Sequence, residues 1–208
     1  IKKTRINLFN IKKVREFLIK FKPKVIINTS GITNVEQCER NRSKAYKTNV
    51  EINNLFSSLS NKYNFKFVSI SSDHLFGVSS KSKFLETDQT FAINYYAHTK
   101  IISEKIILSN SDNSLVIRTN FFGEGLYYRK SFSDEIIDKL SSGLKISLFN
   151  DVYFNPVSIS KLSKIILLLI KKNYRGIINI SSNEKISKYQ FGLLLAKEFK
   201  LDRKLIIP

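Results

Sequence analysis

The stretch of sequence that decides the fold is VSISSDHLFG at residues 68–77, followed by NYYAHTKIISE at residues 94–104. The first segment ends an apolar run over 65–71 that predicts a buried strand finishing in hydroxyl side chains. The second segment predicts a helix over 95–108, reached after a loop of about 20 residues. A buried strand followed by a helix is the repeating unit of parallel α/β proteins.

The same alternation continues along the chain. Helices are predicted to end before Pro23, to cover 43–61, 132–140 and 160–171, and to begin at Ser187, which has capping-box spacing to Gln190. Strands are predicted over 114–118, 145–149, 176–180 and 25–27, the last of these buried on both faces. This order favours βαβ units with right-handed crossovers. We therefore predict an α/β fold, a Rossmann-like doubly wound parallel sheet with a small C-terminal substrate-binding portion.

Two portions follow from this order. Residues 1–120 are predicted to be the dinucleotide-binding portion, and residues 121–208 a mixed portion that contributes the substrate-binding side. A dinucleotide-binding fold opens with a strand, a Gly-rich turn and a helix, and this chain shows no such unit. Gly123 and Gly125 lack the third glycine and indicate an ordinary loop. Together with a start at Ile1, this predicts a fragment whose N-terminal βαβ unit is missing.

The composition narrows the class of protein. With 208 residues, 42% hydrophobic and 25% charged, the chain is typical of a globular domain. A net charge of +18 attracts anions, but the basic residues are spread along the chain without a nucleic-acid-reading motif. The single cysteine, Cys38, cannot form an internal disulfide, and no apolar run is long enough to span a bilayer. We therefore expect a cytoplasmic protein with no nucleic-acid or membrane partner and, because no metal-ligand spacing occurs, no metal.

Tyr96 and Lys100 are the first candidates for chemistry. They are four residues apart, so they share one face of the predicted helix. An ammonium near a phenol favours the phenolate and lowers the pKa of the tyrosine, so the pair could exchange a proton with a substrate oxygen. Ser71 and Ser72 end the preceding strand, at the carboxyl edge where open α/β sheets bind ligands. A hydroxyl, a phenol and an ammonium can polarise a carbonyl while a nicotinamide delivers hydride.

The order ISSDHLFG, ETD, NYYAHTKIISE resembles the active-site region of the extended short-chain dehydrogenase/reductases, most closely the dTDP-4-dehydrorhamnose reductase group. The resemblance implies that Ser72 takes the place of the catalytic Thr, and that Tyr96 and Lys100 are the catalytic pair. The segment KPKVIINTSGITNVEQCE is similar to the family's cofactor-side segment. It implies that NADPH or NADH lies beside a set of residues formed by Thr29, Ser30, Gly31, Ser71, Tyr96 and Lys100.

The second half of the chain also resembles the dTDP-4-dehydrorhamnose reductase group. VIRTNFFGEG and DVYFNPVSISKLSKII are similar to the family's substrate-side segments, and SKYQFGLLLAKEF fits a later helix. They imply that a nucleotide-diphosphate sugar is bound by Thr33, Asp73, Asn120, Phe121 and Asn155. The implied activity is NAD(P)H-dependent reduction of a 4-keto group, for the synthesis of surface polysaccharide sugars, by a possible homodimer.

His74 helps to choose among related reactions. Sugar-nucleotide dehydratases similar to this chain carry a Glu at that position as acid/base, so His74 favours simple reduction. Three other functions stay open: a non-catalytic sugar-nucleotide-binding or regulatory subunit, an NAD-dependent sugar-nucleotide epimerase, and a basic nucleic-acid binder.

Several further residues have two readings. Arg118 could pair with a structural carboxylate or with a substrate phosphate. Residues 127–130, YYRK, could meet the nucleotide or form a surface loop. Cys38 is interpreted as a small helix or loop residue rather than a nucleophile, and His98 as a solvent-facing helix residue.

Overall fold

The computed structural model describes residues 5–77, 83–126 and 130–208. The chain divides into two compact units: Ile1–Arg118 with Tyr174–Asn179, and Thr119–Asn173 with Ile180–Pro208. A short segment of the second half therefore returns to the first unit, which a linear division at residue 120 does not provide for.

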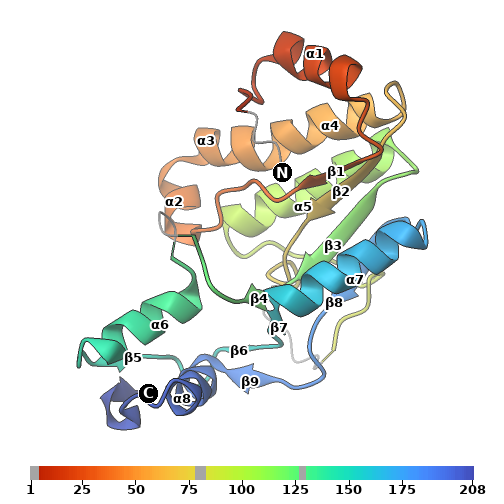
Figure 1. Cartoon of the computed structure of the whole chain (residues 1–208). Helices are drawn as coiled ribbons and strands as arrows, with labels where there is room; N and C mark the ends of the chain where they lie inside the picture. Colours follow the sequence, from red (N-terminus) through yellow and green to blue (C-terminus); the bar gives the residue numbers. More distant parts are fainter. Residues whose placement is uncertain (1–4, 78–82, 127–129) are drawn as a thin grey trace. The chain divides into compact units, whose positions relative to one another are not determined.

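The first unit is built on a parallel sheet. Its strands are β1 (Val25–Asn28), β2 (Lys66–Ile70), β3 (Leu115–Thr119) and β8 (Gly176–Ile180), hydrogen-bonded in that order (Figure 1). β1 and β3 both run parallel to β2, with Ile27 opposite Val68 and Ile70 opposite Ile117. Parallel neighbours joined through helices confirm the α/β, Rossmann-like prediction.

The helices of the first unit begin and end where local signals place them. α1 (Ile11–Phe21) is capped by the Asn10 side chain and ends at Lys22, in the left-handed region, just before Pro23. α5 (Tyr95–Asn110) is capped by Asn94. The remaining helices are α2 (Val35–Arg40), α3 (Arg42–Tyr46), the π-helical turn η1 (Lys47–Glu51) and α4 (Ile52–Ser60). The single helix predicted over 43–61 is therefore interrupted by a π turn, at which the Asn49 side chain bonds the backbone of Ile32.

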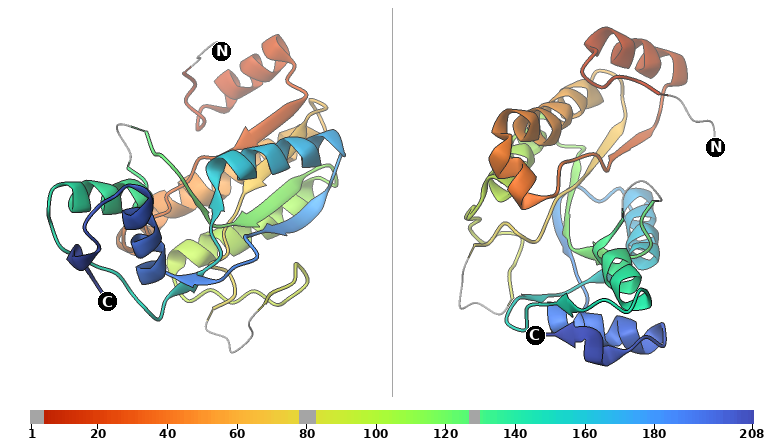
Figure 2. Two further views of the ribbon diagram at one scale, coloured as in Figure 1. Left: turned by 60° about the horizontal axis from the view of Figure 1, so that its bottom comes forward. Right: turned by 90° about the vertical axis from the view of Figure 1, so that its left-hand side faces the viewer.

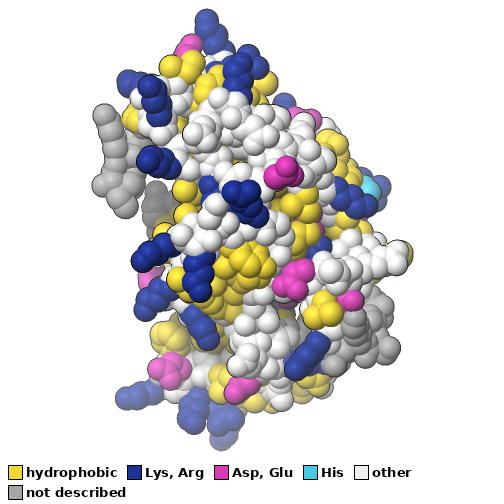
Figure 3. Space-filling view, turned by 90° about the vertical axis from the view of Figure 1, so that its right-hand side faces the viewer, with side chains coloured by type: hydrophobic (Ala, Val, Ile, Leu, Met, Phe, Trp, Pro, Cys, Tyr) yellow, Lys and Arg dark blue, Asp and Glu magenta, His cyan; other side chains and the backbone are white. Residues whose placement is uncertain are grey.

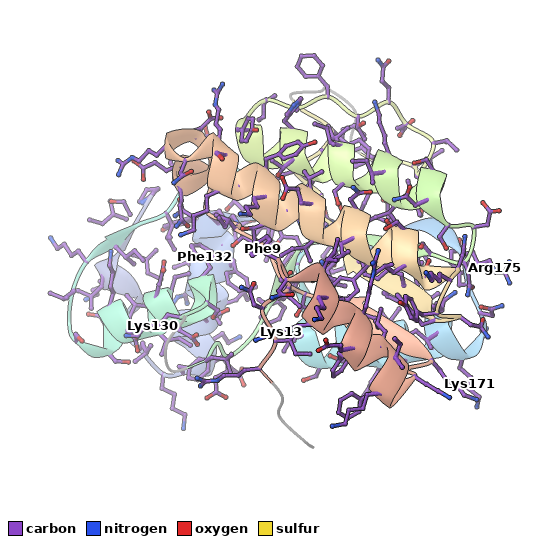
Figure 4. All side chains as sticks on the ribbon, turned by 90° about the horizontal axis from the view of Figure 1, so that it is seen from above. Phe9, Lys13, Lys130, Phe132, Lys171 and Arg175 are labelled. Atoms are coloured by element: carbon purple, nitrogen blue, oxygen red, sulfur yellow. The ribbon has the colours of Figure 1, made fainter. Side chains whose placement is uncertain are left out.

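A continuous apolar core joins these elements. Val14 and Leu18 of α1, Phe56 of α4, Phe67 of β2 and Ile107 of α5 all belong to it. Hydrophobic burial of this set is the main stabilising contribution in the unit. In Figure 4, Phe9 and Lys13 mark the start of α1, where the Phe9 ring lies 4.9 Å from Lys47 Nζ.

The prediction that the strand at 25–27 is buried on both faces was wrong. Ile27 is 40% exposed, because β1 pairs only with β2 within the described ranges and is thus the edge strand of the sheet. Beside this edge lies an apolar cavity of about 560 Å³, whose lining includes Leu8, Phe17, Val25 and Phe56.

The second unit combines short strand pairs with helices (Figure 2). β4 (Phe121–Phe122) runs parallel to β7 (Val157–Ser158), β5 (Ile146–Ser147) runs parallel to β10 (Ile206–Ile207), and β6 (Tyr153–Phe154) runs antiparallel to β9 (Ile186–Ser187). The helices are α6 (Phe132–Ser141), α7 (Ile159–Lys171), α8 (Lys188–Glu198) and the 3₁₀ turn η2 (Arg203–Leu205). α6 packs against α8 around Phe191, and the capping box of Ser187 and Gln190 is confirmed.

Charge is spread over the surface. On the face drawn in Figure 3, Lys and Arg side chains lie scattered among polar and hydrophobic ones. This distribution agrees with a Lys-rich composition rather than one concentrated basic patch on that face.

Candidate active site

The end of β2 and the first turns of α5 together build the site. Three successive residues at the end of β2 each form a hydrogen bond with a residue from a different turn of α5. Ile70 O accepts from Lys100 Nζ at 2.9 Å, Ser71 Oγ donates to Glu104 Oε1 at 2.5 Å, and the Ser72 hydroxyl hydrogen-bonds to the Tyr96 phenol. Because residues four apart share a helix face, one strand end can engage all three turns of α5.

The predicted trio is brought together. Ser72, Tyr96 and Lys100 are 5%, 7% and 5% exposed, and Lys100 Nζ lies 6.0 Å from the centre of the Tyr96 ring. A buried hydroxyl, phenol and ammonium at the carboxyl edge of a parallel sheet can act on a carbonyl oxygen.

The electrostatics of Tyr96 differ from the prediction. Burial raises the pKa of the Tyr96 phenol above its ordinary value of 10, the Ser72 hydrogen bond lowers it, and the Asp73 carboxylate raises it further. The prediction that Lys100 lowers the pKa of Tyr96 was wrong. The Lys100 ammonium donates to Ile70 O, and burial has the largest effect on the phenol. A raised pKa keeps the phenol protonated near neutral pH, as a proton donor requires.

Lys100 is shifted in the opposite direction. Burial lowers the pKa of its ammonium from 10.5 to about 8, and the Glu104 carboxylate is the largest influence that opposes this shift. Lys100 therefore remains mostly charged at neutral pH and loses its proton in mildly alkaline solution.

Gly31, a predicted cofactor-side residue, lies beside Lys100. A Cβ at Gly31 would be 3.2 Å from Asn49 Oδ1, a tight contact, and 3.8 Å from Lys100 Nζ, so glycine lets the backbone pass close to both side chains. Ser30 turns inward, with Oγ donating to Asn28 Oδ1 at 2.6 Å. Thr29 and, on the substrate side, Thr33 are exposed.

Asn49 and Asn53 are functional candidates that sequence reasoning missed. Asn49 Nδ2 donates to Ile32 O and to Thr99 Oγ1, both at 3.0 Å, and Asn53 Nδ2 donates to Ser103 Oγ at 2.8 Å. Asn49 thus ties the loop that contains Gly31 to the helix that carries Tyr96. The signal was two polar pairs at matching helical spacing, 49 with 53 and 99 with 103.

Ser71 and Arg118 both contact Glu104, a buried carboxylate on the same helix as Tyr96 and Lys100. The Ser71 hydroxyl donates to Glu104, and Arg118 Nη2 pairs with Glu104 Oε2 at 2.7 Å. Of the two readings of Arg118, pairing with a structural carboxylate is the one observed.

The two histidines and the single cysteine lie in the first unit. His74 is exposed, with Nε2 3.8 Å from Asp73 Oδ1 and its ring centre 6.4 Å from that of Tyr96. His98 is exposed, as predicted, and Cys38 is a buried residue of helix α2.

Asn120, Phe121 and Asn155 belong to the second unit. Asn120 O accepts from Val157 N at 2.9 Å, and Phe121 is 49% exposed. Asn155 Nδ2 donates to Glu184 O at 2.8 Å, so it also holds the adjoining turn. Of the basic loop, residues 127–129 lie outside the described residues, and Lys130 at the start of α6 pairs with Asp138 at 2.5 Å (Figure 4).

In residues 5–77, 83–126 and 130–208, no group of three or more His, Cys, Asp or Glu side chains is arranged to hold a metal ion. Within the same residues, no helix has the length and apolar character needed to cross a membrane.

Comparison with known proteins agrees with this geometry. The model of the RmlD substrate binding domain family matches residues 1–208. The dTDP-4-dehydrorhamnose reductase of Aggregatibacter actinomycetemcomitans is 24% identical over 203 residues, covering 94% of this chain and 68% of the relative. A hypothetical dTDP-4-dehydrorhamnose reductase from Sulfolobus tokodaii is 31% identical with a TM-score of 0.83, covering 95% of this chain and 69% of that structure. The Bacillus anthracis dTDP-4-dehydrorhamnose reductase in complex with NADP is 22% identical with a TM-score of 0.91, covering 98% and 71%.

The parallel sheet and the relatives place the chain among the NAD(P)-dependent oxidoreductases with an extended short-chain dehydrogenase/reductase fold. Within that class, the chain belongs to the RmlD substrate-binding domain family. It spans about 70% of the length of the relatives compared above.

Proposed function

We propose that this chain carries the catalytic residues of an NAD(P)H-dependent reductase that acts on the 4-keto group of a nucleotide-diphosphate sugar, with dTDP-4-dehydrorhamnose as the leading substrate. The observation that carries the proposal is the convergence of Ser72, Tyr96 and Lys100 at the end of β2. The names of these relatives support this choice of substrate. A further relative, the spore coat polysaccharide biosynthesis protein SpsK of Bacillus subtilis, supports a role in the synthesis of surface polysaccharide sugars.

Each residue has a distinct part in the proposed reaction. The reduced nicotinamide supplies the hydride when it is bound. Tyr96 donates its phenolic proton to the keto oxygen, and its raised pKa keeps that proton available. Ser72 donates a hydrogen bond to the same oxygen and stabilises the negative charge that develops there. Lys100, whose Nζ lies beside Gly31, would hold the nicotinamide ribose.

The rest of the cofactor needs a phosphate-binding element. In dinucleotide-binding folds the pyrophosphate lies on a Gly-rich turn between a strand and a helix. The open edge of β1 can pair with one more parallel strand, and the adjoining cavity of about 560 Å³ can receive apolar side chains of a helix. We infer that a strand–turn–helix unit occupies this edge in the complete enzyme. The substrate and cofactor proposed here, together with the reduced and buried Cys38, favour the cytoplasm as its location.

Loss of the Tyr96 hydroxyl tests the proposal directly. In the full-length protein, Tyr96→Phe should lower kcat by about 10² to 10⁴, the usual contribution of a positioned acid or base, with little change in the Kd for NADPH. Consumption of NADPH on addition of dTDP-4-dehydrorhamnose is the measurement. Tyr95→Phe is the matched control, because Tyr95 is adjacent on α5 but contacts Arg42 and His98 instead.

The outcomes separate the rival functions. Unchanged turnover in Tyr96→Phe removes Tyr96 from the mechanism. A wild-type protein that binds the sugar nucleotide but consumes no NADPH is a non-catalytic subunit. Interconversion of sugar epimers with bound NAD and no net loss of NADPH identifies an epimerase.

A further inference from the structure

A buried ion pair lies beneath the trio. Glu104 and Arg118 are 4% and 5% exposed. Arg118 Nη2 donates to Glu104 Oε2 at 2.7 Å, and Arg118 Nε donates to both carboxylate oxygens at 3.1 Å. The Ser71 hydroxyl adds a fourth hydrogen bond, at 2.5 Å. A carboxylate with this many donors is fixed in orientation as well as in charge.

Arg118 is itself held from other directions. Its Nη1 donates to Glu86 O at 3.2 Å, and its guanidinium lies 5.3 Å from the centre of the Phe76 ring. Glu86 in turn accepts from Asn179 N of β8 at 2.8 Å. The pair is therefore anchored to strands and loops of the first unit that do not belong to the trio.

Glu104 lies one helical turn beyond Lys100, on the face that also carries Tyr96. The titratable groups that influence Lys100 are Glu104 on its own helix and Cys38 on α2, while Asp73 at the end of β2 acts on Tyr96. Glu104 has the largest effect that opposes burial of the Lys100 ammonium. Because a buried cation without a nearby anion tends to lose its proton, this carboxylate favours the charged form of Lys100.

We propose that Glu104, oriented by Arg118, is a positioning residue that keeps Lys100 in its ammonium form and, through Ser71, fixes the end of β2 that carries Ser72. It does so without contact with the substrate or the cofactor. The inference rests on the proposed reductase function for its consequence in turnover, but the charge state of Lys100 can be measured without it.

The test replaces charge while preserving shape. In the full-length protein, Glu104→Gln should lower the pKa of Lys100 by about one unit, because the opposing charge is removed. NMR titration of lysine labelled with ¹³C at the ε position, with the Lys100 signal assigned by Lys100→Arg, measures this pKa. The alkaline limb of the kcat profile should move to lower pH by the same amount. Glu51→Gln, which removes an exposed carboxylate from η1, should change neither readout.

A second variant guards against misfolding. Glu104→Met combined with Arg118→Met replaces the ion pair by apolar side chains, an exchange that buried pairs often tolerate. It should show the same lowered pKa of Lys100. An unchanged titration of Lys100 in either folded variant overturns the inference. If the wild-type protein reduces no keto sugar, the proposed function fails, and the NMR titration still decides the role of Glu104.

Discussion

At the scale of single residues, burial of the Lys100 ammonium lowers the stability of the folded chain. Its ammonium is buried and donates a hydrogen bond to Ile70 O. The fall of its pKa from 10.5 to about 8 corresponds to roughly 3 kcal/mol that the folded state loses by holding the charged form. A neutral side chain would be easier to bury at this position.

This cost predicts a pH-dependent stability difference. Between pH 8 and 10.5 the folded chain has released the Lys100 proton that the unfolded chain still holds, so the destabilising contribution of this group shrinks as pH rises. Lys100→Met should therefore gain most over the wild type, by up to about 3 kcal/mol, below pH 8, and this advantage should shrink toward pH 10.5. Urea unfolding at several pH values measures it. An advantage that does not vary with pH would contradict the assignment.

At the scale of elements, two helices and two strands are joined by polar side chains rather than by apolar contacts alone. Asn53 Oδ1 accepts from Asn28 Nδ2 of β1 at 2.7 Å and from Ser69 Oγ of β2 at 3.0 Å, while its Nδ2 donates to Ser103 of α5. Because every one of these groups is buried, the network sets one register between α4, α5 and the sheet.

Removal of the central amide should loosen that register. Asn53→Ala leaves buried donors on Asn28 and Ser69 without this acceptor, so the free energy of unfolding should fall by about 3 kcal/mol. Denaturant unfolding monitored by circular dichroism measures the change. Asn54→Ala, next in sequence but exposed, should cost about 1 kcal/mol or less. Equal losses in the two variants would mean that the buried network contributes little.

At the scale of the whole molecule, the net charge of +18 surrounds a site for which anionic ligands are proposed. A positive field raises the encounter rate of a nucleotide-diphosphate sugar without changing the reaction at the trio. The charge can therefore serve substrate capture even though it arises from residues spread along the chain.

This predicts a salt effect confined to association. As ionic strength rises from about 0.01 M to about 0.3 M, kcat/KM for the sugar nucleotide should fall several-fold while kcat stays nearly constant. Steady-state kinetics over a series of NaCl concentrations tests it. A salt-independent kcat/KM would show that steering is absent, and tight, steeply salt-dependent binding of DNA would instead revive the nucleic-acid alternative.

The sequence by itself determined the α/β class, most element positions and the Ser72, Tyr96 and Lys100 candidates, because periodicity and helical spacing are local properties of the chain. Only the tertiary structure decided that Ser71 and Arg118 both bind Glu104. It also decided the π turn at Asn49 and the direction of the pKa shift at Tyr96. Those features depend on contacts between residues distant in sequence, such as Ser71 with Glu104 or Glu86 with Asn179, and on burial. Desolvation and long-range hydrogen bonds exist only once the strands and helices have packed, so no local pattern could have indicated them.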